Sequence, residues 1–166
     1  TLALLFLLLP PPAAVRGQAA IGWQDAAKHV GEQATVEGVV AAVHAGWRGT
    51  VAGVAEAALA EVCRTAGVGP ERVRVHLGPC IRVGCYEFDG PELHDLVARF
   101  GAAVRGTTTS GTPAMDLPAA THAALVAAGV PEVHDTSGCT ACDTRWYSHR
   151  ARGELERLAT TAWLEE

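Results

Sequence analysis

The segment that decides the fold is Ala42-Val43-His44-Ala45-Gly46-Trp47-Arg48-Gly49-Thr50. It follows an apolar run from Val36 to Val43 and precedes a helical pattern from Val51 to Ala66. The change from continuous apolar residues to helical spacing predicts a strand, a tight turn and a helix in that order. We therefore expect His44 at the end of the strand and Arg48 at the start of the helix.

The residue types in this turn suit an anion site, with or without a metal. The first N–H groups of a helix lack partners within the helix, and together with the helix dipole they attract anions. Gly46 and Gly49 allow the backbone to approach a bound group closely. Arg48 offers a fork of donors to phosphate or carboxylate, and His44 can ligate a metal or move a proton. A plain glycine-rich turn with a half-buried histidine and a surface arginine explains the spacing equally well.

Two further motifs lie downstream of this turn. Gly78-Pro79-Cys80-Ile81 runs on to Cys85-Tyr86-Glu87, and Cys139-Thr140 is followed by Trp146-Tyr147-Ser148-His149-Arg150. Together with His-Ala-Gly-Trp-Arg-Gly at 44–49, these motifs resemble the multicopper polyphenol oxidase (laccase-domain) family. Members of that family are now regarded as zinc-dependent purine nucleoside phosphorylases and adenosine deaminases. The resemblance covers roughly residues 39–164.

The resemblance implies an α/β fold with a layered mixed sheet flanked by helices, incomplete because family members carry further upstream strands. It implies phosphorolysis of adenosine, inosine, guanosine and methylthioadenosine, and deamination of adenosine, with a purine nucleoside and phosphate as small-molecule partners. The site residues that it implies are the catalytic His44 and Arg48 and the substrate-binding Gly46, Gly49, Cys85 and Tyr86. A small buried hydrophobic role is an equal alternative for Cys85, and Tyr147 and Arg150 either line the substrate site or only pack.

The family metal site uses two histidines and a cysteine, and His44 matches one of those histidines. The other two ligands belong to Gln-Val-His and Ala-Asp-Cys segments, and this sequence contains neither. The only upstream histidine is His29, and no cysteine precedes Cys63. Catalytic zinc sites use three protein ligands and leave a fourth position for water. We therefore expect zinc, or copper as the alternative metal, to bind weakly at His44 and the activity to be impaired.

The first 38 residues do not resemble this family. Residues 1–20 have an apolar run, three prolines and a small-residue region, which is typical of the tail of a signal peptide. Residues 21–38 resemble the opening of a secreted oligonucleotide-binding-type β-barrel, so residues 39–166 would be the C-terminal part of the laccase-like domain. The leader predicts export, whereas the family resemblance predicts a cytoplasmic protein.

Composition limits the remaining possibilities. With 166 residues, of which 49% are hydrophobic, the chain has the length of one domain with a sizeable core. The net charge is −5 and Lys28 is the only lysine, so the absence of a basic stripe argues against nucleic acid as a partner. The apolar run in the leader is too short to span a membrane. The pair Cys139-x-x-Cys142 is taken as ordinary reduced thiols, because no second pair accompanies it.

Alternating strands and helices predict a layered α/β domain. The expected strands are 34–44, 73–77, 130–135, 145–149 and 157–164. The expected helices are 51–66, which Thr50 would cap, 91–100 and 117–128. Residues 105–113 are expected to be a loop.

Two other functions compete with nucleoside chemistry. Copper-dependent phenol oxidation lacks the paired histidines of multicopper sites, and a secreted non-enzymatic binding module lacks the strands of a full barrel.

Overall fold

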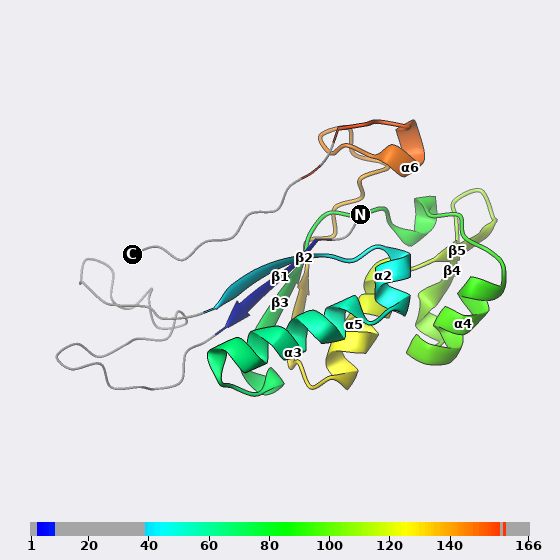
Figure 1. The fold of residues 1–166 in the computed structure, drawn as a ribbon. Coiled ribbons are helices and arrows are strands. Elements are labelled where there is room, and N and C mark those ends of the chain that lie inside the picture. The colour runs from blue at the N-terminus through cyan, green and yellow to red at the C-terminus, as the bar shows by residue number, and fades with distance from the viewer. Residues whose placement is uncertain (1–2, 9–38, 157, 159–166) are drawn as a thin grey trace, which may run out of the picture.

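The computed structural model describes residues 3–8, 39–156 and 158. Figure 1 shows how strands and helices alternate along them. The elements are β1 (Ala3–Leu8), β2 (Val40–His44), α2 (Trp47–Val51), α3 (Val54–Ala66), β3 (Val73–Leu77), α4 (Pro91–Phe100), β4 (Arg105–Thr107), β5 (Pro113–Met115), α5 (Leu117–Ala127), β6 (Glu132–Asp135) and α6 (His149–Arg152). Short 3-10 helices cover Pro70–Arg72, Val83–Cys85 and Ala102–Val104.

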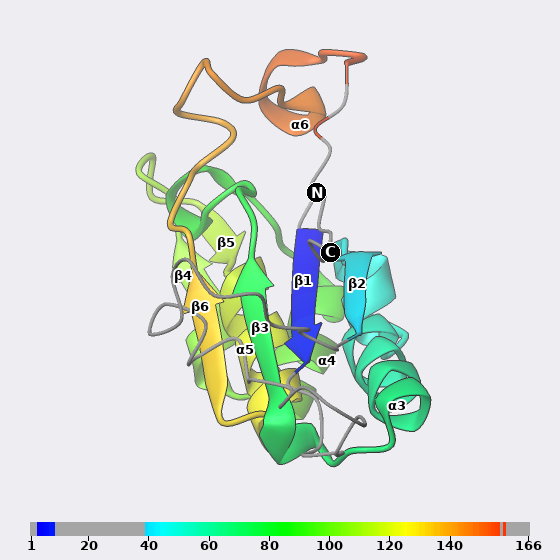
Figure 2. The same cartoon turned by 90° about the vertical axis from the view of Figure 1, so that its left-hand side faces the viewer.

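One four-stranded sheet organises the domain, in the order β2-β1-β3-β6. Strand β1 pairs antiparallel with both β2 and β3, whereas β3 and β6 are parallel. In Figure 2, helices α4 and α5 lie behind the strands, and α3 lies next to β2 at the edge of the sheet. The expected α/β class, a mixed sheet flanked by helices, is therefore confirmed.

The central strand comes from the start of the chain. Ala3–Leu8 lies within the segment 1–20 that the sequence marks as a leader, yet its backbone pairs on both edges. Residues 9–38 lie outside the described residues, so the leader and the barrel-like segment 21–38 stay predictions. Among the described residues, no helix has the length and apolar character needed to cross a bilayer.

The core lies between the sheet and its helices. Strand β3 alternates buried and half-buried residues, and its inward side chains Val73, Val75 and Leu77 are at most 1% exposed. Helix α4 contributes Leu93 and Leu96, three residues apart and therefore on the same face. These positions match the apolar periodicity of the sequence, so the expected strand and helix are confirmed at both places.

The turn after β2 differs from its prediction. Instead of one helix from 51 to 66 there are two, α2 and α3, separated at Gly53, whose φ of 82° falls in the left-handed region. Thr50 does not cap the second helix. It is fully buried inside α2, and its Oγ1 donates to the carbonyl oxygen of Gly46 at 3.1 Å. Glycine accepts the left-handed conformation readily, which ends α2 and allows α3 to start in a new direction.

Two other predictions were wrong and one is not covered. Residues 105–113 are not simply a loop, because β4 and β5 pair antiparallel as a small hairpin. Residues 145–149 are not a strand: Asp143 pairs with Arg145, and the Ser148 hydroxyl accepts from the N–H of Ala151 at the start of α6. Local side-chain hydrogen bonds of this kind compete with strand formation. The strand expected over 157–164 lies almost wholly outside the described residues.

Shortening a core side chain tests this arrangement. Leu93→Ala removes a side chain with no solvent exposure, so we expect the free energy of unfolding to fall by about 2–5 kcal/mol. Val126→Ala is the matched control, since Val126 lies on α5 and is 50% exposed, and its effect should stay within about 0.5 kcal/mol. Urea denaturation followed by circular dichroism measures both values, and equal losses would contradict the proposed burial.

Candidate functional site

The β2–α2 turn places His44 and the glycines as the sequence predicts, at the end of the sheet. His44 is exposed, and partial desolvation lowers the pKa of its imidazole. A Cβ added at Gly46 would lie 3.5 Å from the Nε2 atom of His44, so the ring stands beside the turn. A Cβ at Gly49 would lie 3.2 Å from Cγ1 of Val54, so the missing side chain lets α2 pack tightly on α3.

A row of aromatic rings follows the turn. The Trp47 ring meets the Phe88 ring edge-on, with centroids 5.2 Å apart, and Phe88 meets Tyr86 in the same manner at 5.7 Å. The guanidinium carbon of Arg48 lies 4.5 Å from the Trp47 ring centroid, and that of Arg150 lies 5.6 Å from the Tyr86 ring centroid. Cation–π contact at these distances holds both arginines beside the aromatic row.

Both arginines border one shallow recess of about 400 Å³. Its lining residues are Trp47, Arg48, Glu87, Phe88, Asp89, Glu92 and Arg150. Arg150 is fixed there by a 2.9 Å hydrogen bond from its Nη2 to the carbonyl oxygen of Glu87. Among the described residues, His44 is not part of this lining. This recess thus joins Arg48 to Arg150, a residue whose role the sequence analysis leaves open between lining the substrate site and packing.

The donor set around His44 does not fit the metal that the family resemblance implies. Catalytic zinc needs three protein ligands. Within residues 3–8, 39–156 and 158, His44 belongs to no group of three histidine, cysteine or carboxylate side chains close enough to share an ion. Metal binding and catalysis by His44 therefore stay predictions, as do the roles expected of Gly46, Gly49, Cys85 and Tyr86.

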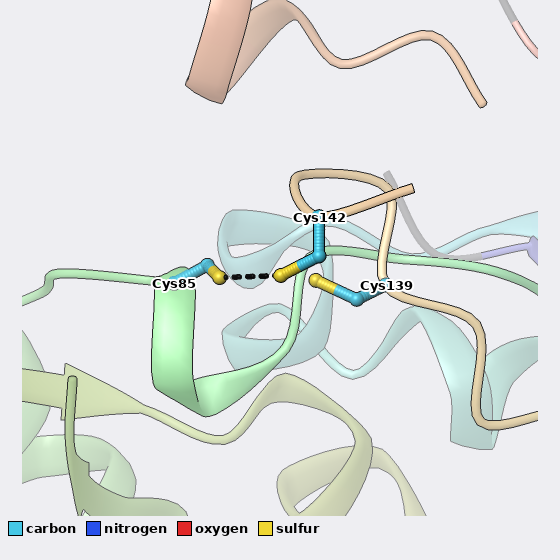
Figure 3. Close-up of side chains that lie close together, drawn as sticks. All are labelled: Cys85, Cys139 and Cys142. Atoms are coloured by element: carbon cyan, nitrogen blue, oxygen red, sulfur yellow. Dashed lines mark hydrogen bonds between the residues drawn. The ribbon is translucent and has the colours of Figure 1, made fainter. Parts of the chain in front are cut away.

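Sulfur atoms gather at a second place that the sequence did not reveal. The Sγ atoms of Cys85, Cys139 and Cys142 all lie within 4.8 Å of one another, and those of Cys85 and Cys142 are 3.0 Å apart (Figure 3). The sequence analysis treats each thiol separately, with Cys85 as a substrate contact or a small buried hydrophobic residue and the other two as ordinary thiols. Only the tertiary contact between two distant loops brings them together, and no local spacing encodes that contact.

Backbone hydrogen bonds hold these two loops together. Cys80 donates its N–H to the carbonyl oxygen of Gly138 at 3.1 Å, and Thr140 donates its N–H to the carbonyl oxygen of Cys80 at 2.9 Å. Arg82 adds a bond from Nε to the same Gly138 oxygen at 3.2 Å and a two-point pairing with the Asp135 carboxylate. Paired guanidinium–carboxylate bonds fix orientation as well as distance.

Cys139 and Cys142 differ in acidity. Burial raises the pKa of Cys139. Hydrogen bonds from the backbone N–H groups of Arg82, Cys142 and Ala141 outweigh burial and lower this pKa to about 7. Hydrogen bonds with Cys85 and then Cys139 raise the pKa of Cys142 to about 12. The arrangement therefore favours the thiolate of Cys139 over that of Cys142, and thiolates are the form that binds metals.

The Arg82–Asp135 pair predicts a pH dependence of stability. Hydrogen bonding to Arg82 holds the pKa of Asp135 below its ordinary value. A lowered carboxyl pKa stabilises the fold above the unfolded pKa of about 4, and this contribution disappears as the pH falls through the folded value. We therefore expect the melting temperature of Asp135→Asn to lie below that of the unaltered protein at pH 7, with a gap that closes towards pH 3.

Scanning calorimetry across that pH range measures the gap. The matched control is the same substitution in an Arg82→Ala background, where no guanidinium is left to depress the carboxyl pKa. A gap that stays constant with pH, or that persists when Arg82 is absent, would rule out this pairing as its origin.

Several characterised proteins are similar to this chain in sequence. A purine nucleoside phosphorylase of Streptomyces griseus is 41% identical over 162 residues, covering 96% of this chain and 54% of the relative. One from Streptomyces coelicolor is 37% identical over 140 residues, covering 84% of this chain and 51% of the relative. An adenosine deaminase from an unknown prokaryotic organism, RL5, is 38% identical over 113 residues, covering 60% of this chain and 40% of the relative. The chain spans about half the length of the curated relatives that it matches most extensively.

Solved structures agree with the fold. The protein YlmD of Geobacillus stearothermophilus superposes with a TM-score of 0.59 at 31% identity, covering 68% of this chain and 44% of that one. The Neisseria meningitidis protein NMB0706 gives a TM-score of 0.62 at 24% identity, covering 92% and 52%, and shows the fold alone. A model of the family described as multi-copper polyphenol oxidoreductase laccase matches residues 30–165. Because that match takes in most of the chain, the protein belongs to the multi-copper polyphenol oxidoreductase laccase family.

Proposed function

We propose that this protein carries out phosphorolysis of purine nucleosides, with phosphate and base held in the recess between Arg48 and Arg150. The observation that carries this proposal is that two guanidinium groups and two half-buried aromatic side chains, Trp47 and Phe88, border one hollow. The names of the Streptomyces relatives support the same chemistry. The preferred substrates are adenosine, inosine, guanosine and methylthioadenosine.

Each part of the recess has a role in this reaction. Arg48 and Arg150 hold phosphate, because guanidinium groups match its oxygens in charge and geometry. We place the purine beside Trp47 and Phe88, whose half-buried rings border the same recess. A phosphate oxygen then attacks C1′ of the ribose while the bond from C1′ to the purine nitrogen breaks, and the purine leaves with a proton taken from solvent. The products are the free base and ribose 1-phosphate.

Orientation is the main contribution of the protein to this step. A bound phosphate placed beside C1′ reacts as if it were highly concentrated, because the loss of its translational freedom has already occurred on binding. The acidic residues Glu87, Asp89 and Glu92 share the same recess. Their negative charge limits how tightly phosphate binds, so we expect weak binding of phosphate alone and tighter binding beside a nucleoside.

Adenosine deamination is the second candidate, favoured by the relative named as an adenosine deaminase. Deamination needs an activated water, which the family is expected to take from zinc. Because the donor set around His44 does not fit such an ion, we propose phosphorolysis as the principal activity and deamination as the impaired one.

Removing the guanidinium of Arg48 tests the proposal. Arg48→Ala deletes a charge-assisted contact to phosphate, and contacts to charged groups contribute about 1.5–3 kcal/mol. We therefore expect kcat/KM for adenosine phosphorolysis to fall roughly ten- to one-hundred-fold. The measurement is chromatographic detection of adenine and ribose 1-phosphate in phosphate buffer, with inosine monitored separately as the product of deamination.

The matched control is Arg64→Ala, an arginine on α3 whose partner is Glu61 in an exposed ion pair. Its activity should equal that of the unaltered protein. Failure of the unaltered protein to release adenine, or equal activity of the Arg48 and Arg64 variants, would overturn the assignment of the recess.

A further inference from the structure

The cluster of Cys85, Cys139 and Cys142 lies outside the family metal position at His44. Its members come from two loops, the 3-10 helix Val83–Cys85 and the turn at 139–142. Figure 3 shows the side chains of the three residues converging on one point. Cys85 and Cys139 are half-buried and Cys142 is exposed, so one side of the cluster faces solvent.

The spacing of the sulfurs suits a metal ion. Zinc–sulfur bonds of about 2.3 Å in tetrahedral geometry place sulfur atoms about 3.8 Å apart. The three Sγ atoms already lie within 4.8 Å of one another, and the closest pair, at 3.0 Å, has to separate by less than about 1 Å. Side-chain rotation at the exposed Cys142 provides this movement without a change in the backbone.

The backbone around the cluster is fixed before any ion arrives. The N–H of Asp143 donates to the carbonyl oxygen of Cys139 at 3.0 Å and closes the turn that presents Cys139 and Cys142. Arg152 donates from Nη1 to the carbonyl oxygens of Thr140 and Ala141, at 3.1 and 3.0 Å. The N–H of Cys85 donates to the carbonyl oxygen of Arg82 at 2.9 Å. A site that is ordered in advance loses little conformational entropy on binding.

We propose that Cys85, Cys139 and Cys142 form a zinc site with three thiolate ligands and a fourth position open to solvent. Soft thiolate sets select zinc or Cu(I) over magnesium, calcium or manganese. The Cys-x-x-Cys spacing at 139–142 is the usual one for a pair of zinc ligands, and Cys85 supplies the third. This proposal does not depend on the proposed nucleoside chemistry.

Cobalt and zinc titrations of the reduced, metal-stripped full chain test this site. We expect one Co²⁺ per chain, with sulfur-to-cobalt charge-transfer absorption and the visible bands of tetrahedral Co²⁺, displaced by one equivalent of Zn²⁺. Cys142→Ser should weaken zinc binding by more than about 10-fold, because loss of even an outer partner of a ligand weakens affinity by about 10- to 100-fold. Cys142 is exposed, so its substitution leaves the core intact.

Two matched variants locate the ion. Cys63→Ser changes a thiol on α3 away from the cluster, and His44→Ala changes the residue at the family position; both should keep the affinity and the charge-transfer band. Binding that is lost in His44→Ala and kept in Cys142→Ser would overturn the proposal, as would a spectrum without sulfur-to-cobalt absorption. An increase in melting temperature with zinc, absent in Cys142→Ser, gives an independent readout that needs no enzymatic activity.

Discussion

The candidate site depends on one constraint, the parallel pairing of β3 with β6. This pairing continues past the ends of both strands. Beyond the sheet, the two segments that follow β3 and β6 stay side by side through a parallel bridge between Cys80 and Cys139. Arg82 fastens the junction by bonding to Gly138 and to Asp135. Because parallel strands deliver their carboxyl ends to one edge of a sheet, two loops far apart in sequence become neighbours there.

The recess and the thiol cluster share the segment from Cys85 to Phe88. Cys85 belongs to the cluster, Tyr86 contacts Arg150, and Phe88 lines the recess. The hairpin strand β5 supports this segment, because Met115 donates its N–H to the Tyr86 carbonyl oxygen at 3.2 Å and Phe88 donates its N–H to the Pro113 oxygen at 3.0 Å. The cluster and the recess are thus joined by one short segment that is hydrogen-bonded to β5.

The sequence could predict what depends on local periodicity. The alternation in Val73, Val75 and Leu77, the spacing of Leu93 and Leu96, and the glycine that ends α3 all specify their elements directly. It could not predict what depends on contacts between distant segments. The short pairing of β4 with β5, and the approach of Cys85 to the pair Cys139 and Cys142, leave no mark on local pattern. His44 and Arg48 stand four residues apart in one turn, and the contact of the Arg48 guanidinium with the Trp47 ring is likewise a feature of the folded turn rather than of the spacing.

Strand β1 has a decisive position in the sheet, because it lies between β2 and β3. Ala3–Leu8 is the only link, through hydrogen bonds, between β2 and β3 within the described sheet. A peptidase that cut after residue 20 would detach this strand and leave two separated halves with exposed polar edges. Any change that removes the backbone pairing of Ala3–Leu8 would therefore separate β2 from the rest of the described sheet.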